Sequence, residues 1–85
     1  MHEFSLAQGL HNQLLDLARE NKMAKVQMAE VCVGDNAGIV VESFVFGFNV
    51  LAEQNDVTQG MNLIVVKDQG SDLILLQVEL DSGSD

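Results

Sequence analysis

The sequence predicts an α+β fold in which two helices pack on one face of a three-stranded mixed sheet, in the order helix, strand, helix, strand, strand. Two segments repeat apolar residues at three- and four-residue intervals, as amphipathic helices do. Three shorter segments alternate apolar and polar residues or are rich in β-branched residues, as strands are. A chain of 85 residues supports one domain with a modest core. We therefore predict a single domain over residues 1–81 and a flexible polar tail over residues 82–85.

The first helix is predicted over residues 4–21. Its apolar stripe consists of Ala7, Leu10, Leu14, Leu17 and Ala18. Lys22 follows as a cation near the negative end of the helix dipole. We assign His11, which stands beside Asn12, to the polar face of this helix.

The first strand is predicted over residues 25–33, and a turn follows from Gly34 to Gly38. Because successive side chains of a strand point to opposite faces, Ala29, Val31 and Val33 share one face and Met28, Glu30 and Cys32 the other. Cys32 is interpreted as a small apolar packing residue, since nothing in the sequence indicates a lowered thiol pKa. The second helix is predicted over residues 41–54, with a buried ridge of Phe44, Phe48 and Leu51.

The last two strands are predicted over residues 61–67 and 72–81. Their short connection predicts an antiparallel hairpin, in which Gly70 can take the positive φ that a tight turn favours. We expect four of their side chains to face the helices: Leu63, Val65, Leu73 and Leu75.

The opposite face of the sheet is predicted to carry an apolar patch, called here the outer face, made of Met28, Cys32, Ile64, Val66, Ile74 and Leu76. Monomers rarely leave large apolar patches in water, so we expect a homodimer or a docked partner on it. Two alternatives remain open. A register shifted by one residue would exchange the two faces, or a tail folds over the patch.

Composition excludes several classes of function. The chain has four basic and thirteen acidic residues and a formal net charge of −9, which argues against binding to a phosphate backbone. No apolar run is long enough to span a bilayer, and the start lacks the pattern of a secretory signal. With a single cysteine, we expect a reducing cytoplasm. No phosphate-binding loop or activated nucleophile is recognisable, so we do not expect an enzyme.

The start of the chain, Met1-His2-Glu3, is the candidate metal site. The Met1 amine, the His2 backbone nitrogen and the His2 ring nitrogen form a chelate that suits square-planar nickel(II) or copper(II). Glu3 either adds an oxygen ligand or simply favours the positive end of a helix. His11 lies roughly 13 Å from His2 along a helix, so one ion cannot bridge them within a chain.

Four short strings resemble one known family. Met1-His2-Glu3-Phe4-Ser5-Leu6 before a helix resembles the start of the hydrogenase nickel-incorporation proteins of the HypA/HybF type, whose terminal Met-His-Glu holds nickel. Three further strings resemble the family's turn, second helix and strand entry: Gly34-Asp35-Asn36-Ala37-Gly38-Ile39, Phe44-Val45-Phe46-Gly47-Phe48-Asn49-Val50-Leu51 and Gly60-Met61-Asn62-Leu63. The resemblance covers residues 1–67 and resumes in the last strand.

The resemblance implies a metallochaperone that captures Ni(II) at Met1, His2 and Glu3. It also implies service to [NiFe]-hydrogenase, or in some organisms urease, and as partners a nickel-handling GTPase and the hydrogenase large subunit. Two alternatives stay open. One is a metal-free interaction or dimerisation module, and the other is a nickel domain without delivery activity.

The sequence departs from the family at one place. The family inserts a zinc-binding segment with two Cys-x-x-Cys pairs between its last two strands, where this chain has only Lys67-Asp68-Gln69-Gly70-Ser71. A structural zinc site needs four ligands, mostly thiolates, and Cys32 is the only cysteine. We therefore expect no intramolecular zinc, and the sequence leaves open whether the segment was lost naturally or by engineering.

Overall fold

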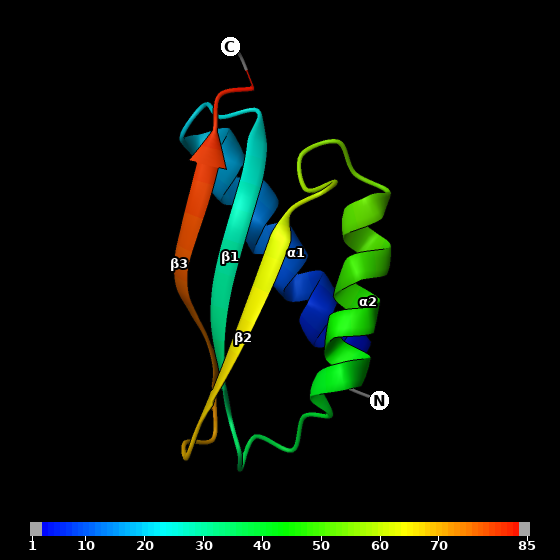
Figure 1. The fold of residues 1–85 in the computed structure, drawn as a ribbon, viewed down its shortest axis with the longest axis vertical. Helices are drawn as coiled ribbons and strands as arrows, with labels where there is room; N and C mark the ends of the chain where they lie inside the picture. Colours follow the sequence, from blue (N-terminus) through cyan, green and yellow to red (C-terminus); the bar gives the residue numbers. More distant parts are fainter. Residues whose placement is uncertain (1–2, 84–85) are drawn as a thin grey trace.

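A computed structural model describes residues 3–83 and has the predicted order of elements (Figure 1). The bounds are α1 Glu3–Glu20, β1 Lys25–Gly34, α2 Val41–Glu53, β2 Asn62–Asp68 and β3 Leu73–Asp81. Every bound lies within one residue of the sequence prediction. The predicted α+β fold class, with a three-stranded mixed sheet, is confirmed.

The order of the strands corrects one prediction. β1 lies in the middle of the sheet, parallel to β2 on one side and antiparallel to β3 on the other. The predicted hairpin between the last two strands is therefore wrong, because they flank β1 and do not pair. The connection from β1 to β2 runs through α2, which is the crossover that parallel neighbours need. The central position also explains why β1 is the most buried strand, with Val31, Cys32 and Val33 all buried.

The connection between β2 and β3 crosses the end of β1 (Figure 1). The backbone N–H of Gly34 donates to the Asp72 carbonyl at 2.9 Å, and that of Asn36 donates to the Gly70 carbonyl at 3.0 Å. A Cβ on Gly34 would lie 2.2 Å from the Gly70 oxygen, so only glycine permits the crossing. Without a hairpin, Gly70 does not adopt the positive φ that such a turn would favour. In the range 3–83 the glycines with a positive φ are Gly38, Gly60 and Gly83.

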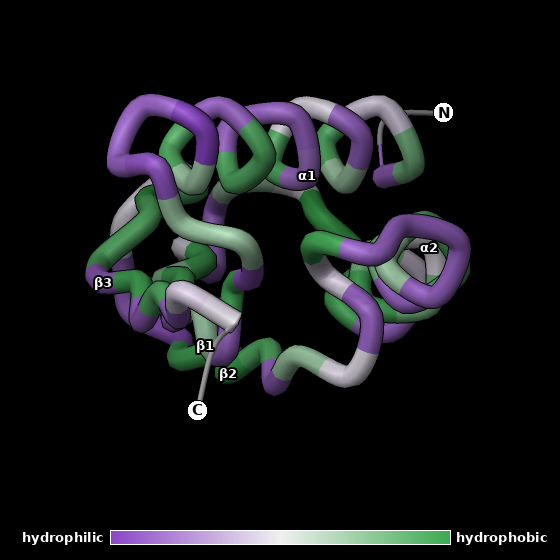
Figure 2. The backbone as a smooth tube through the Cα atoms, turned by 90° about the horizontal axis from the view of Figure 1, so that it is seen from above, coloured by the Kyte–Doolittle hydropathy of each residue, from purple (hydrophilic) through white to green (hydrophobic). Residues whose placement is uncertain are grey.

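The core fills the space between the sheet and the two helices. Figure 2 shows α1 as a layer over the sheet and α2 closing the side next to β2. Phe44 and Phe48 of α2 and Leu14 of α1 are 0% exposed, and Val26 and Val31 of β1 meet them. Burial of each such side chain contributes about 1.5–3 kcal/mol. This core sets the position of α1 relative to α2, and with it the place where α1 begins.

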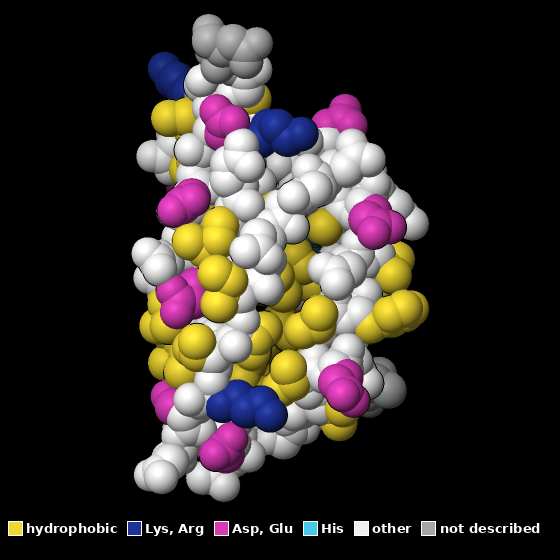
Figure 3. All heavy atoms as spheres, viewed as in Figure 1, with side chains coloured by type: hydrophobic (Ala, Val, Ile, Leu, Met, Phe, Trp, Pro, Cys, Tyr) yellow, Lys and Arg dark blue, Asp and Glu magenta, His cyan; other side chains and the backbone are white. Residues whose placement is uncertain are grey.

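The two faces of the sheet are as predicted, so the alternative of a shifted register is excluded. Leu63, Val65, Leu73 and Leu75 pack against the core. On the outer face Ile64 is 37%, Ile74 48% and Leu76 52% exposed, and Figure 3 shows hydrophobic side chains gathered over the strands on this side. The register shift of β3 between Leu75 and Gln77 leaves Leu76 without a partner on β1. No helix within residues 3–83 is long and apolar enough to cross a membrane.

Candidate functional site

Glu3, the third residue of the candidate metal site, connects the starts of the two helices. It is the first residue of α1, and its Oε2 accepts a hydrogen bond from the backbone N–H of Val40 at 3.1 Å. Val40 is the N-cap residue of α2 and its own side chain forms no capping bond. The carboxylate thus supplies the negative charge that a helix N-terminus favours. Glu3 therefore lies at the N-terminal ends of both helices: it begins α1, as the helix-dipole interpretation expected, and it also caps α2.

Phe4 makes a second contact between the start of α1 and α2. A Cβ on Gly47 would lie 2.9 Å from Phe4 Cδ1, so the ring lies directly against the α2 backbone. The missing side chain of Gly47, which is buried within α2, makes room for it. Together the two contacts fix the point at which the described chain begins.

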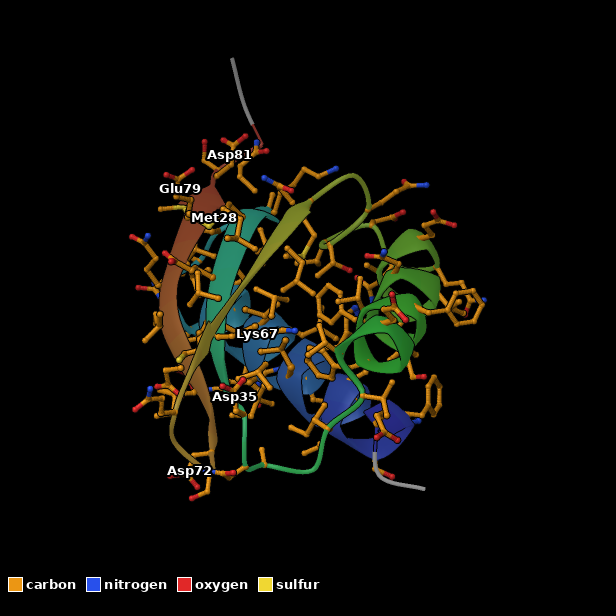
Figure 4. All side chains as sticks on the ribbon, turned by 60° about the horizontal axis from the view of Figure 1, so that its bottom comes forward. Met28, Asp35, Lys67, Asp72, Glu79 and Asp81 are labelled. Carbon is orange, nitrogen blue, oxygen red and sulfur yellow. The ribbon has the colours of Figure 1, made fainter. Side chains whose placement is uncertain are left out.

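Met1 and His2, the principal predicted ligands, lie outside the described residues. Within residues 3–83, no group of three or more His, Cys, Asp or Glu side chains is placed to hold a metal ion. Figure 4 shows why for the labelled carboxylates: Asp35 and Asp72 lie toward one end of the sheet, and Glu79 and Asp81 toward the other. The described part of the chain therefore offers no competing metal site of that size.

His11 is buried, and its predicted place on the polar face of the helix is wrong. The residue is 6% exposed, its Nε2 lies 2.8 Å from Thr58 Oγ1, and its ring meets Phe48 edge-on with centroids 5.9 Å apart. Position 11 follows Ala7 by four residues and precedes Leu14 by three, so it belongs to the apolar stripe. Helical spacing could thus have indicated that His11 is buried. No signal in the sequence indicated that its hydrogen-bond partner is Thr58, 47 residues away.

Cys32 is buried, as predicted for a packing residue, and is 8% exposed. Its Sγ donates to Asp68 Oδ2 at 3.0 Å. This hydrogen bond, followed by burial, raises the pKa of the thiol. The same bond and the Gly70 N–H lower the pKa of Asp68. The cysteine therefore stays protonated at neutral pH and is poorly suited to act as a nucleophile or metal ligand.

Comparison with known proteins defines the class and then the family. Residues 1–71 match a family model described as hydrogenase/urease nickel incorporation, metallochaperone, hypA, which is a class of metal carriers and not of enzymes. The chain belongs to the HypA family.

The curated relatives are longer than this chain. A hydrogenase maturation factor HypA of Caldanaerobacter subterraneus subsp. tengcongensis is 41% identical over 64 residues, which cover 75% of this chain and 55% of the relative. The HypA of Azorhizobium caulinodans is 30% identical over 71 residues, covering 84% and 62%. The chain thus spans a little over half the length of these relatives.

Two solved structures share the fold. The solution structure of the Ni metallochaperone HypA from Helicobacter pylori aligns with a TM-score of 0.74 at 19% identity, covering 100% of this chain and 91% of that one. Another HypA solution structure aligns with a TM-score of 0.80 at 20% identity, covering 96% and 98%. At these identities the likeness concerns the fold.

Proposed function

We propose that this chain is a nickel-binding metallochaperone domain that captures Ni(II) at Met1, His2 and Glu3 and passes it on for the maturation of [NiFe]-hydrogenase or urease. The observation that carries the proposal is the family match, which starts at residue 1 and so includes the whole Met-His-Glu string. The curated relatives are named hydrogenase maturation factors, which supports the hydrogenase as the recipient.

The proposed chemistry is capture followed by ligand exchange. The Met1 amine and the two His2 nitrogens are strong in-plane donors of the kind that Ni(II) selects. Delivery would then require that a partner's ligands replace these donors. The amine and the imidazole must lose protons to bind, so nickel binding should weaken as the pH falls.

Glu3 has two proposed contributions. Its Oε2 interacts with the Val40 N–H, which holds the residue after His2 in place at the start of α2. Its carboxylate also belongs to the proposed Met1-His2-Glu3 site, where it adds an oxygen ligand or a negative charge that favours a cation. A neutral Glu3→Gln variant can still accept the Val40 bond, whereas Glu3→Ala cannot, so the pair separates positioning from charge.

Delivery is tested by complementation in a host that lacks its own nickel-incorporation factor. We expect the wild-type chain to restore nickel-dependent hydrogenase activity and His2→Ala to fail at equal protein level. Restoration by His2→Ala would refute the proposed site. If the wild-type chain binds nickel but fails to restore hydrogenase activity, the chain is a nickel domain without delivery activity.

The exposed outer face favours a second candidate function, assembly. Cys32 pairs with Val66 on one side and with Ile74 on the other, which makes an apolar row across the sheet, and Ile64 and Leu76 extend it. We propose a homodimer through this face. If the chain is a metal-free module, this assembly would be its only function. Sedimentation should show a dimer that Ile74→Lys dissociates, and a compact monomer at high protein concentration would contradict it.

The proposed partners are a nickel-handling GTPase and the hydrogenase large subunit, which would place the chain in the cytoplasm. A net charge of −9 suits association with a basic surface, since complementary charge speeds encounter. Zinc has no part in the proposal, because Cys32 is the only cysteine.

A further inference from the structure

The exposed side of α2 carries a row of residues with an apolar centre and acidic ends. Glu42, Phe46, Val50 and Glu53 follow one another at steps of three or four residues along the helix, so their side chains lie in one line. From residue 42 to residue 53 this line is roughly 16 Å long. We call these four residues the α2 strip.

Phe46, at the centre of the strip, is the most exposed large hydrophobic residue within residues 3–83, at 72%. Val50, one turn further along, is 37% exposed. The Phe4 ring of α1 is 43% exposed and lies against Gly47, the residue after Phe46. The opposite side of α2 supplies the core, so the fold gains little from an aromatic ring at position 46. Aromatic side chains commonly anchor protein interfaces, and the exposure of Phe46 therefore indicates a contact outside this chain.

The acidic ends of the strip have no cation to pair with. α2 contains no Lys or Arg, and the ion pair within residues 3–83 joins Arg19 to Asp16 on α1. Glu42 and Glu53 are both exposed. Figure 3 shows hydrophobic side chains at the outer margin of α2, with acidic side chains above and below them. An occupant that complements the strip therefore has an apolar pocket flanked by cations, as in interfaces with an apolar centre and a polar rim.

The strip begins next to the start of α1. Val40, the residue before α2, donates its backbone N–H to Glu3 at 3.1 Å, and Phe4 lies against Gly47 in the middle of α2. A protein that binds the strip would therefore lie beside Glu3, the third residue of the proposed nickel site. Ligand exchange requires that the recipient's ligands lie close to the donors they replace, so this position suits a recipient of the metal.

We propose that the α2 strip is the docking site for the protein that receives the nickel, which binds Phe46 in an apolar pocket and pairs Lys or Arg side chains with Glu42 and Glu53. The inference rests on the proposed function, because it takes the hydrogenase large subunit as the recipient. A second copy of this chain does not fit, since two antiparallel strips would place Glu42 opposite Glu53. The same carboxylates would repel a nucleic acid or an anionic lipid surface.

Calorimetric titration of the full chain with the purified precursor of the hydrogenase large subunit, with a metal chelator present and at several salt concentrations, tests the docking site. We expect the wild type to bind, with an affinity that falls as the salt concentration rises. Phe46→Gln should weaken binding about ten-fold or more, whereas Ile74→Gln, the matched change on the outer face of the sheet, should not. Glu42→Gln combined with Glu53→Gln should flatten the salt dependence, and Glu20→Gln, at the end of α1, should leave it nearly unchanged.

Wild-type affinity in Phe46→Gln, a wild-type salt dependence in the double glutamine variant, or no binding by the wild type would each overturn the proposal. Because Phe46 is exposed, Phe46→Gln should keep the wild-type melting temperature and the wild-type response to nickel. These two measurements separate docking from folding and from metal capture. If binding depends on Phe46 but the wild type does not capture nickel, the strip is a docking site and the proposed nickel function is wrong.

Discussion

Glu3 Oε2 accepts a hydrogen bond from the Val40 backbone N–H at 3.1 Å, which connects the first residue of α1 to the residue before α2. The contact joins two segments 37 residues apart and is made by the third residue of the proposed nickel site. It makes the start of α1 part of the α2 N-terminus, so a change at Glu3 should affect both stability and metal capture.

Replacement of this cap should destabilise the fold modestly. We expect Glu3→Ala to lower the free energy of unfolding by about 0.5–1 kcal/mol, because a helix N-terminus loses its acceptor and its favourable charge. Glu3→Gln should retain most of the bond. Glu53→Ala, at the other end of α2, is the matched control and should change little. Equal losses in Glu3→Ala and Glu53→Ala, measured by urea denaturation, would show that the contact contributes nothing specific.

The crossing of the β2–β3 connection over β1 should be intolerant of any side chain. In Gly34→Ala the new Cβ would meet the Gly70 carbonyl oxygen at 2.2 Å and the Ser71 nitrogen at 2.7 Å. Both are backbone atoms, so we expect a loss of about 2 kcal/mol or more in the free energy of unfolding.

Gly9→Ala is the control for this substitution. A Cβ there meets nothing within 4 Å, and Gly9 is exposed in the interior of α1, so alanine should stabilise the helix by about 0.5–1 kcal/mol. Thermal melts of the two variants should move in opposite directions. A Gly34→Ala variant as stable as the wild type would mean that the crossing differs from the one described.

The Cys32 thiol should react slowly with alkylating reagents, because its hydrogen bond to Asp68 and its burial raise its pKa. Asp68→Asn removes the carboxylate that stabilises the protonated thiol, so the pH profile of the alkylation rate should shift to lower pH. Asp72→Asn, an exposed change at the same end of the sheet, is the control and should keep the wild-type profile. If Asp68→Asn also keeps it, the bond does not control the thiol.

The outer face can be separated from the core by paired substitutions. Leu76→Gln replaces an exposed side chain that has no partner on β1, so it should weaken the proposed dimer and cost the monomer less than about 0.5 kcal/mol. Leu75→Gln makes the same change at a side chain that packs against the core, so it should lower the free energy of unfolding several-fold more. Equal losses of monomer stability in the two variants would contradict the assignment of the faces.

Local patterns in the sequence were sufficient for the elements and the faces of the sheet. The stripe from Ala7 to Ala18, the alternation from Lys25 to Val33, the ridge of Phe44, Phe48 and Leu51, and the two β-rich segments at 61–67 and 72–81 together placed every helix and strand within one residue. The same helical spacing includes His11, but its polar neighbour Asn12 led to its assignment to the polar face. Burial of the His11 imidazole depends on a distant hydrogen-bond partner, Thr58, which no local pattern reveals.

Strand order was beyond local patterns. A short connection usually joins neighbouring strands, and Gln69-Gly70-Ser71-Asp72 is short enough for a hairpin. The chain instead spans the end of β1, a distance of roughly 10 Å for two strand spacings, because Gly34 lets the backbone pass and its N–H bonds to Asp72. The glycine was visible in the sequence, whereas its partner across the crossing was not.

Nickel titration followed by d–d absorbance tests the central claim most directly, and a matched set of proteins makes it specific. We expect the wild type with an unmodified start to develop the absorbance of square-planar Ni(II), and His11→Gln to respond equally. His2→Ala and a protein with residues added before Met1 should lose the response. A response of wild-type size from either of these last two proteins would contradict nickel capture by the Met1 amine and His2.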